Sequence, residues 1–453
     1  MRTLDLRRQR LGADDLRRVV PRAELDISAA STSAAALIAD VRERGSRALL
    51  DQAERFDHVR PTSLRVPVRD IDAAVRALPP RVRTALEHAI ARVREVSAAQ
   101  VPPAASTTLG DGAVVQQRWQ PVARAGLYVP GGKAVYPSSV VMNAVPAQVA
   151  GVDSVALASP AQREFGGSVH PLILGAAGLV GIDEVYTLGG AGAIGALAYG
   201  VPDIPLRAVD IVTGPGNIYV AAAKRLVRGV VGIDAEAGTT EILVVADASA
   251  DPRLVAADLL SQAEHDEAAA SLLVTDSEEL AKAVQKELGE LLAETPNRDR
   301  ASVALEGQQS AIVLVDDELT AVRFSDAYAP EHLEVHTADP DATLRQLTHA
   351  GAIFLGSHSP VSLGDYLAGS NHVLPTGGSA RYSSGLGAYT FLRPQQVIRY
   401  DETGLGAVAQ DVIALAEAER LPAHGAAVAA RQSTGTASAG TASAGSASTG
   451  TAH

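Results

Sequence analysis

Apolar residues recur with helical spacing through about the first 110 positions of the chain. They are set among arginines and alanines, as at Leu86, Ile90 and Val93. Apolar positions three and four residues apart predict amphipathic helices, because such residues share one helix face. We therefore expect the chain to begin with a helical lead-in.

From residue 125 the pattern changes to short apolar runs that alternate with helical segments. The predicted strands are 125–129, 154–158, 184–188, 209–212, 241–245, 271–275, 311–315 and 352–355. A further helix is predicted to begin at Pro330. Strands that alternate with helices are typical of parallel sheets covered on both faces. The pattern predicts two α/β domains.

Composition narrows the classes to which this protein can belong. With 453 residues and 47% hydrophobic content, the chain can form two or more globular cores. A formal net charge of -13 disfavours binding to nucleic acid, which requires neutralisation of phosphates. No apolar run approaches the roughly 20 residues that span a bilayer, and no signal peptide is evident, so we expect a cytoplasmic protein without a membrane partner. The absence of cysteine excludes disulfides and thiolate chemistry.

The end of the chain, residues 432–453, is a low-complexity segment rich in Ser, Thr, Gly and Ala. Such a segment buries too little apolar surface to offset the entropy lost on ordering. We expect it to be disordered and dispensable for chemistry.

One predicted helix carries two potential metal ligands. It begins with Asp251 as the N-cap and Pro252 at the first helical position. Gln262 and His265 lie three residues apart, so their side chains would share one side of the helix. The alternative is that His265 is a core histidine with no ligand role.

Three glycine-containing loops could approach a cofactor. Residues 190–195, Gly-Ala-Gly-Ala-Ile-Gly, follow a predicted strand and open a helix, as in the dinucleotide-binding fingerprint, and Asp210 lies where a ribose-binding acid could follow. The loops 128–132 and 213–217 also place glycines after strands, where backbone amides can approach a ligand. Tight turns or close helix packing would select the same glycines.

Acids and histidines occur together in the last third of the chain. Glu331 and His332 stand at the predicted helix start, where a carboxylate beside an imidazole can serve as base and acid. The other pairs are Asp365 with His372, in a glycine-rich stretch predicted to be irregular, and Glu419 with His424, around a helix break. Each could equally be a set of solvated surface residues.

Taken together, these segments identify a resemblance that covers residues 1–431. The motifs are Gly-Ile-Asp-Ala-Glu-Ala-Gly-Thr-Thr-Glu at 232–241, Asp-Leu-Leu-Ser-Gln-Ala-Glu-His-Asp at 258–266, Glu-His-Leu-Glu at 331–334, Gly-Asp-Tyr-Leu-Ala-Gly-Ser-Asn-His-Val-Leu-Pro-Thr at 364–376 and Ala-Glu-Arg-Leu-Pro-Ala-His at 418–424. In this order they resemble the histidinol dehydrogenases, which use NAD and zinc at the end of histidine biosynthesis.

The resemblance implies an architecture. It implies two incomplete Rossmann-like domains of the aldehyde-dehydrogenase type, with small helical extensions that form a domain-swapped homodimer. The expected parts are an N-terminal extension at 1–26, a first α/β domain with the zinc and catalytic residues at 27–127 and 242–386, a second α/β domain on the NAD side at 128–241, a dimerisation segment at 387–431 and the tail at 432–453.

The resemblance also implies site residues. One Zn²⁺ per subunit would be held by Gln262, His265, Asp365 and His424. The substrate, L-histidinol, would contact these four ligands and also Thr240, His332, His372 and Glu419, with Glu419 facing its ammonium group. Glu419 and His424 would act across the dimer interface. NAD would lie against Tyr128, Gly192 and Asn217.

The implied reaction oxidises L-histidinol to L-histidine through a bound aldehyde, with two NAD and one water. His332 would take the alcohol proton in the first oxidation, and Glu331 would then activate water to attack the aldehyde. Because the chain has no cysteine, the thiohemiacetal route of ordinary aldehyde dehydrogenases is closed to it. Zinc would mainly orient the substrate.

Two positions depart from the family pattern. Gly192 stands where the family usually has a glutamine that touches the cofactor, and this change itself creates the apparent fingerprint at 190–195. Thr239 stands where proline is usual, which leaves the rigidity of that loop open, whereas Thr240 keeps the expected hydroxyl. One lost hydrogen bond predicts weaker NAD affinity, by roughly 1 kcal/mol.

Two other functions fit parts of the pattern. The same fold could oxidise another small alcohol, such as a sulfonated diol, although a sulfonate beside Glu419 would be repelled. Alternatively, the chain could be a catalytically silent dimer bridged by structural zinc, although such a site needs neither Glu331 nor His332.

Overall fold

We describe the protein from a computed structural model, which places residues 1–23, 27–131, 135–236 and 238–435. The chain forms two compact units. The first contains residues 1–101 and 121–392, and the second contains 102–120 and the residues from 393 onward. The first unit holds two parallel sheets with helices on their faces, which confirms the predicted α/β class.

A six-stranded parallel sheet forms one half of the first unit. Its strands are, in spatial order, β1 (Arg2–Asp5), β11 (Ala311–Leu314), β10 (Ala270–Thr275), β9 (Glu241–Ala246), β12 (His332–His336) and β13 (Ala352–Leu355). Every residue of β9, β10, β11 and β12 is buried, as expected for parallel strands covered on both faces. The strand order reverses between β9 and β12.

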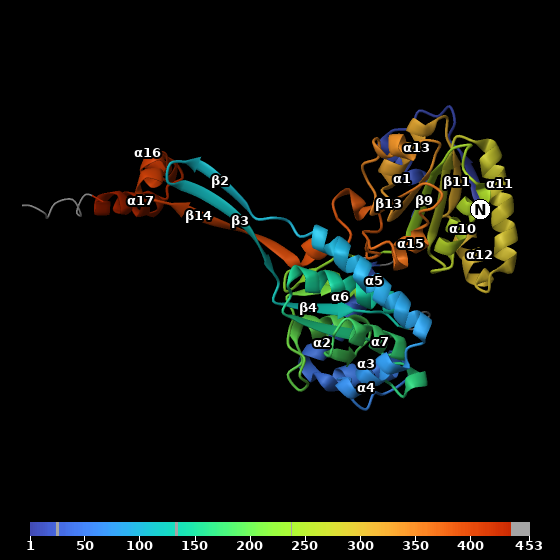
Figure 1. Cartoon of the computed structure of the whole chain (residues 1–453), viewed down its shortest axis with the longest axis horizontal. Coiled ribbons are helices and arrows are strands. Elements are labelled where there is room, and N and C mark those ends of the chain that lie inside the picture. Colours follow the sequence, from blue (N-terminus) through green and yellow to red (C-terminus); the bar gives the residue numbers. More distant parts are fainter. Residues whose placement is uncertain (24–26, 132–134, 237, 436–453) are drawn as a thin grey trace, which may run out of the picture. The chain divides into compact units, whose positions relative to one another are not determined.

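Helices cover both faces of this sheet (Figure 1). On one face lie α10 (Pro252–Ala263), α11 (Glu278–Glu294) and α12 (Arg298–Glu306), and on the other lie α1 (Ala13–Val19) and α13 (Glu318–Tyr328). Asp251 caps α10 by accepting a hydrogen bond from Arg253 N, which confirms the predicted helix start. Two short helices, α14 (Pro340–Leu344) and α15 (Val361–Tyr366), follow β12 and β13.

The second sheet has five parallel strands. In spatial order these are β6 (Val185–Thr187), β5 (Ser154–Ser159), β4 (Arg124–Tyr128), β7 (Ile211–Thr213) and β8 (Gly232–Ile233). The helices of this half are α2 (Ile27–Arg44), α3 (Ser46–Phe56), α4 (Val68–Ala77), α5 (Pro80–Ala99), α6 (Pro137–Ala150), α7 (Pro171–Leu179), α8 (Gly190–Tyr199) and α9 (Ile218–Val227), with single 3-10 turns at Arg163–Phe165 and Ala388–Phe391. Another 3-10 turn, Ser379–Arg381, contacts α13 of the first sheet through Arg381. The strand order reverses between β4 and β7.

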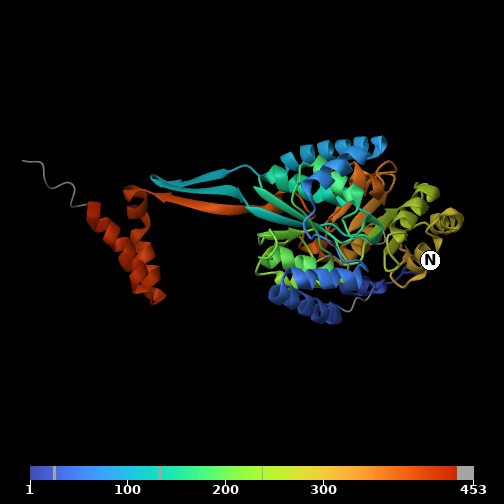
Figure 2. The same ribbon diagram turned by 90° about the horizontal axis from the view of Figure 1, so that it is seen from below.

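The second unit is a three-stranded sheet with two helices. Its strands are β14 (Leu392–Tyr400), β3 (Ala113–Pro121) and β2 (Ala105–Gly110), and α16 (Glu402–Ala418) and α17 (Pro422–Gly435) follow β14 (Figure 2). Asp401 caps α16 by accepting from Gly404 N, and its own N–H donates to Gly112 O in the β2–β3 turn. Gly112 has φ 71, and a Cβ there would overlap the Asp401 carboxylate, so this turn requires glycine.

The structure corrects several expected boundaries. The N-terminus is no separate extension, because β1 pairs with β11 in the six-stranded sheet. Residues 27–99 were expected with the zinc-side domain, but α2 packs against α8 and α9 of the five-stranded sheet, where small residues allow close approach. Of the segment 387–431, expected to form a dimer, residues 387–392 belong to the first unit and the rest to the second, and its role in a dimer stays a prediction. Only tertiary pairing could reveal these assignments.

The element at Pro330 was also predicted wrongly. The residues that follow it form strand β12, not a helix, because α13 has already ended at Tyr328 with Ala329 in the left-handed region. Residues His332–His336 pair in parallel with β9 on one side and with β13 on the other, so this segment completes the sheet as a strand. Of the expected tail, 436–453 lie outside the described residues, and α17 continues to Gly435. Among the helices described, none is long and apolar enough to cross a membrane.

Candidate functional site

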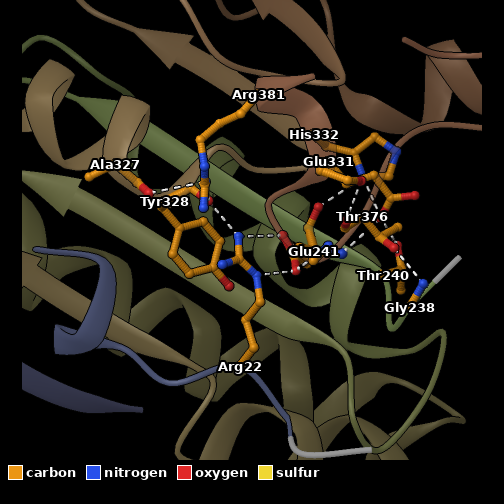
Figure 3. A network of polar contacts seen from close by, with 12 residues as sticks. Arg22, Gly238, Thr240, Glu241, Ala327, Tyr328, Glu331, His332, Thr376 and Arg381 are labelled. Atoms are coloured by element: carbon orange, nitrogen blue, oxygen red, sulfur yellow. Dashed lines mark hydrogen bonds and ion pairs between the residues drawn. The ribbon is translucent and has the colours of Figure 1, made fainter. Parts of the chain in front are cut away.

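A short chain of hydrogen bonds joins three of the proposed site residues at the amino edge of the six-stranded sheet (Figure 3). Thr240 Oγ1 donates to Glu331 Oε2 at 2.7 Å and accepts from Gln262 Nε2 at 2.6 Å. Glu241 N also donates to Glu331 Oε2, at 2.9 Å. Both bonds end on one oxygen, so Glu331 Oε1 is the oxygen that can act on a water molecule. Burial raises the pKa of Glu331, which makes its carboxylate a stronger base.

The backbone of Glu241 also fixes the tautomer of His332. Nδ1 of His332 lies 3.0 Å from Glu241 O, and a carbonyl can only accept, so Nδ1 carries the proton. The other ring nitrogen, Nε2, therefore presents a lone pair. His332 is 5% exposed and its Nδ1 lies 3.6 Å from Glu331 Oε2. The arrangement places an imidazole beside a buried carboxylate, a pair that can accept and donate protons.

Glu241 is held in place by an ion pair within the protein. Its carboxylate is bound by both Nε and Nη2 of Arg22, at 2.6 and 3.2 Å, and also accepts from Gly377 N at 3.0 Å. The Arg22 guanidinium stacks on the ring of Tyr328 at 3.9 Å, and Arg381 Nη1 reaches Tyr328 O from the other side (Figure 3). Because one residue orients both Glu331 and His332 through its backbone, this anchor sets the geometry of the pair.

Gln262 and His265 present atoms that suit a metal ion. Gln262 is 1% exposed, and its Oε1 has no hydrogen-bond partner within the described residues while Nε2 is held by Thr240. A buried amide oxygen without a partner is costly unless a ligand fills the gap. His265 lies in the turn after α10, and its Nδ1 donates to Ser261 O at 2.9 Å. Its Nε2 is therefore free to bind a metal, as in most histidine ligands.

Asp365 and His372 meet at the junction of the two sheets. Asp365 lies in the short helix α15, where an irregular stretch was predicted, and its backbone O accepts from His372 Nδ1 at 3.0 Å. His372 Nε2 lies 3.1 Å from the hydroxyl of Ser139, in the first turn of α6. Burial lowers the pKa of His372, and the neighbouring Asp365 carboxylate opposes that shift. His372 is thus held between α15 and α6.

Glu419 and His424 belong to the second unit. Glu419 is the C-cap of α16 and His424 lies in the first turn of α17, and both are exposed.

The proposed NAD residues lie at the carboxyl edge of the five-stranded sheet. Tyr128 ends β4, and its hydroxyl accepts from Gly190 N at 3.1 Å. Burial raises the pKa of Tyr128 to about 12, so it stays neutral. Asn217 follows the neighbouring strand β7 and caps α9 through Oδ1, which leaves its Nδ2 for a ligand. The reversal of strand order falls between β4 and β7, and parallel sheets commonly bind ligands at such a point.

Asp210 is not a ribose-binding acid. Its Oδ2 accepts from Ala123 N and Arg124 N at 2.8 and 2.9 Å, at the start of β4. That is the amino edge of the sheet, opposite the edge that carries Tyr128 and Gly190. The spacing in sequence suggested the role, but the direction of the strands excludes it.

The space beside Gly192 is filled by another glutamine. A Cβ at Gly192 would lie 2.1 Å from Oε1 of Gln52, a residue of α3 that is 8% exposed. Gln52 Nε2 donates to Leu37 O at 3.1 Å, which holds the side chain there. Gln52 therefore occupies the space into which a side chain at residue 192 would extend.

Several residues that shape the site were missed in the sequence. Glu241 carried a usable signal, because a carboxylate at the start of a fully apolar strand must find a partner. No sequence signal marked the other three residues, because each reaches the site from a distant segment; they are Arg22, Ser139 and Gln52.

Comparison with known proteins agrees with this geometry. A family model described as histidinol dehydrogenase matches residues 20–432. The histidinol dehydrogenase of Leifsonia xyli subsp. xyli is 69% identical over 431 residues, which is 95% of this chain and 99% of the relative. That of Corynebacterium diphtheriae is 56% identical over 436 residues, or 95% and 97% of the two chains. The crystal structure of histidinol dehydrogenase from Elizabethkingia anophelis matches with a TM-score of 0.90 at 32% identity and covers 96% of this chain and 99% of its own.

Proposed function

The chain belongs to the histidinol dehydrogenase family, and from this premise we propose how its residues oxidise L-histidinol to L-histidine through L-histidinal, with two NAD and one water. The hydrogen-bonded chain from Gln262 through Thr240 to Glu331 carries the proposal, because it couples a metal donor to a water-activating base. We place this reaction in the cytoplasm.

We assign one Zn²⁺ per subunit to Gln262, His265 and Asp365, with His424 from a second copy of the chain. The unpartnered Gln262 Oε1 supports the first ligand, and the bond of His265 Nδ1 to Ser261 O, which leaves Nε2 for the metal, supports the second. The exposure of His424 and Glu419 supports a homodimer in which the second unit completes a neighbouring site. Oxygen and nitrogen donors without sulfur suit zinc, which when bound orients the substrate and polarises its oxygen.

The protein residues then divide the proton transfers. His332 accepts the proton of the substrate hydroxyl at Nε2 as NAD takes the first hydride. Glu331 Oε1 next removes a proton from water, and the resulting hydroxide adds to the aldehyde to give a gem-diolate. The proton that His332 holds from the first step passes to this oxygen and gives the gem-diol, so His332 can accept a proton again as the second hydride leaves. Thr240 orients Glu331, and we assign His372 and Glu419 to the substrate, Glu419 to its ammonium group.

The comparisons give no support to oxidation of a sulfonated diol, and a catalytically silent zinc dimer has no use for the Glu331 and His332 geometry. One assay tests the proposal against both: NADH formed per L-histidinol with zinc present. We expect about two equivalents. The proposal would be overturned if the protein oxidised a sulfonated diol but not L-histidinol, or if it oxidised no alcohol at all.

Removing one proposed metal ligand should abolish zinc binding at this site. In His265→Asn we expect zinc affinity to fall by more than about 100-fold, because losing even an outer partner of a ligand costs 10–100-fold. The affinity is measured by competition with a chelator. His349→Asn is the matched control, since this part-buried histidine also bonds a carbonyl, Asp326 O. Equal zinc affinity in His265→Asn and wild type would contradict the assignment.

A glutamine at residue 192 should strengthen NAD binding only when space is made for its side chain. We expect Gly192→Gln alone to gain no NAD affinity and to lose about 1 kcal/mol of stability, because it displaces Gln52 from its bond to Leu37 O. Gly192→Gln combined with Gln52→Ala should lower the NAD Michaelis constant several-fold. Thermal melting and NAD titration of both variants test this. A single variant that binds NAD as well as the double variant would show that Gln52 is no obstacle.

A further inference from the structure

Three strands of the five-stranded sheet end side by side at the edge proposed for NAD. β4 and β8 pair in parallel with β7 from either side, and their register places Tyr128 and Asp234 on opposite sides of Gly214. Gly214 has φ 118, and a Cβ there would lie 2.0 Å from Tyr128 O, so only glycine lets the two backbones approach this closely. The loop 214–217 that starts here ends at Asn217, the other residue at this edge assigned to NAD.

A buried ion pair holds both main-chain polar groups of Gly214. Gly214 N donates to Asp234 Oδ2 at 2.8 Å, and Gly214 O accepts from Lys224 Nζ at 3.0 Å. Lys224 also forms an ion pair with Asp234, and the two side chains are only 2% and 3% exposed. Desolvation of two charges offsets most of the attraction between them, so such a pair adds little net stability. What the pair provides is a fixed position for Gly214.

The same lysine connects the loop to the helix that follows it. Asn217 caps α9 by accepting from Tyr219 N and Val220 N through Oδ1. Lys224 lies about two helical turns further on, on the same face as Asn217. Long side chains in a helix lean toward its N-terminus, which lets Lys224 Nζ reach back to Gly214 O. This bond closes a ring through the loop and the start of α9, so the position of Asn217 depends on it.

The ion pair is separate from the residues that move protons. Among the described residues, neither Lys224 nor Asp234 bonds to Glu331 or His332, whose geometry is set by Glu241 on the other sheet. Loss of the pair should therefore act on the binding of the cofactor and not on the proton transfers.

We propose that Lys224 and Asp234 are positioning residues for NAD, because they hold the loop 214–217 against Tyr128 and thereby set where Tyr128 and Asn217 meet the cofactor. The inference rests on the proposed function, which assigns NAD to this edge of the sheet. A pair that only stabilised the fold would affect the melting temperature and would leave the Michaelis constants unchanged.

A double variant separates positioning from stability. Lys224→Met with Asp234→Leu removes both charges, so no unpaired charge stays buried, but Gly214 loses both of its bonds. We expect the Michaelis constant for NAD to rise by about tenfold or more. The Michaelis constant for L-histidinol and the rate at saturating NAD should stay within about threefold of wild type. Steady-state NADH formation measures these values, and thermal melting shows that the variant is folded.

Asp234→Asn should give the opposite result. The amide keeps an oxygen for Gly214 N, and Lys224 keeps its bond to Gly214 O, but the buried lysine loses its counter-charge. The melting temperature should fall, while the Michaelis constant for NAD stays within about threefold of wild type. Arg124→Met with Glu184→Leu is the matched control, since this ion pair, with side chains 7% and 17% exposed, lies at the amino edge of the same sheet. It should leave the Michaelis constant for NAD unchanged.

The inference is overturned if the double variant has the NAD constant of wild type, or an increase no larger than that of the control pair. It is equally overturned if the double variant does not fold, because stability is then the main role of the pair, or if Asp234→Asn is as impaired toward NAD as the double variant.

A further variant distinguishes failure of this inference from failure of the cofactor site itself. Asn217→Asp keeps the oxygen that caps α9 and loses the Nδ2 donor, so it should raise the Michaelis constant for NAD. If it does not, the assignment of NAD to this edge is wrong and the inference falls with it. If it does and the double variant does not, only the role of Lys224 and Asp234 is wrong.

Discussion

Glu331→Gln should slow the oxidation of L-histidinal by about 10²–10⁴-fold while the oxidation of L-histidinol to the aldehyde changes by less than about tenfold. The amide keeps the shape of the carboxylate but cannot take a proton from water, and the chain has no cysteine through which the aldehyde could react instead. Single-turnover NADH formation should show a first equivalent at nearly the normal rate and a slow second one. With L-histidinal as the substrate, the whole reaction should be slow.

Glu306→Gln serves as the control, since Glu306 is exposed at the end of α12, and it should leave both steps unchanged. The pH dependence gives a second readout. Because burial raises the pKa of Glu331, the wild-type aldehyde step should slow as the pH falls through that raised value and the base becomes protonated. The Gln variant should lack this dependence. Equal slowing of both oxidation steps would rule out the water-activating role.

Arg22→Met should destabilise the protein by about 3–5 kcal/mol. The Glu241 side chain is 1% exposed, and without Arg22 its carboxylate keeps only Gly377 N among the bonds described. An unpaired buried charge is far more costly than the loss of a surface pair. Because the Glu241 backbone orients Glu331 and His332, the catalytic rate at saturating substrate should fall as well. Denaturant unfolding measures the first effect and steady-state NADH formation the second.

A surface pair provides the comparison for this prediction. Arg253→Met breaks the ion pair with Glu287, in which the arginine side chain is 60% exposed, and should cost less than about 1 kcal/mol. Replacing both partners, as in Arg22→Met with Glu241→Met, should recover much of the stability, because no charge is then left buried. If Arg22→Met costs no more than Arg253→Met, the anchor contributes little.

Much of the local structure could be predicted from the pattern of residues. The strands around Tyr128, Ser154 and Glu241 and the capped start of α10 at Asp251 were predicted within a residue or two. Periodicity and caps are local properties, so short stretches of sequence contain them. The strand at His332 was missed because Pro330 and Glu331 also suit a helix start, and only the slot between β9 and β13 decides the matter.

The α/β class, the family resemblance and the identities of the candidate residues follow from residue spacing and from motifs, both of which can be read along the chain. Tertiary structure alone decided how those residues are arranged. It bonded His332 Nδ1 to the carbonyl of Glu241, placed Gln52 where Gly192 leaves room, and joined Glu241 to Arg22. Each of these is a contact between segments far apart in sequence. Such contacts are fixed by packing and by the need to pair buried charges, and neither is visible until the chain is folded.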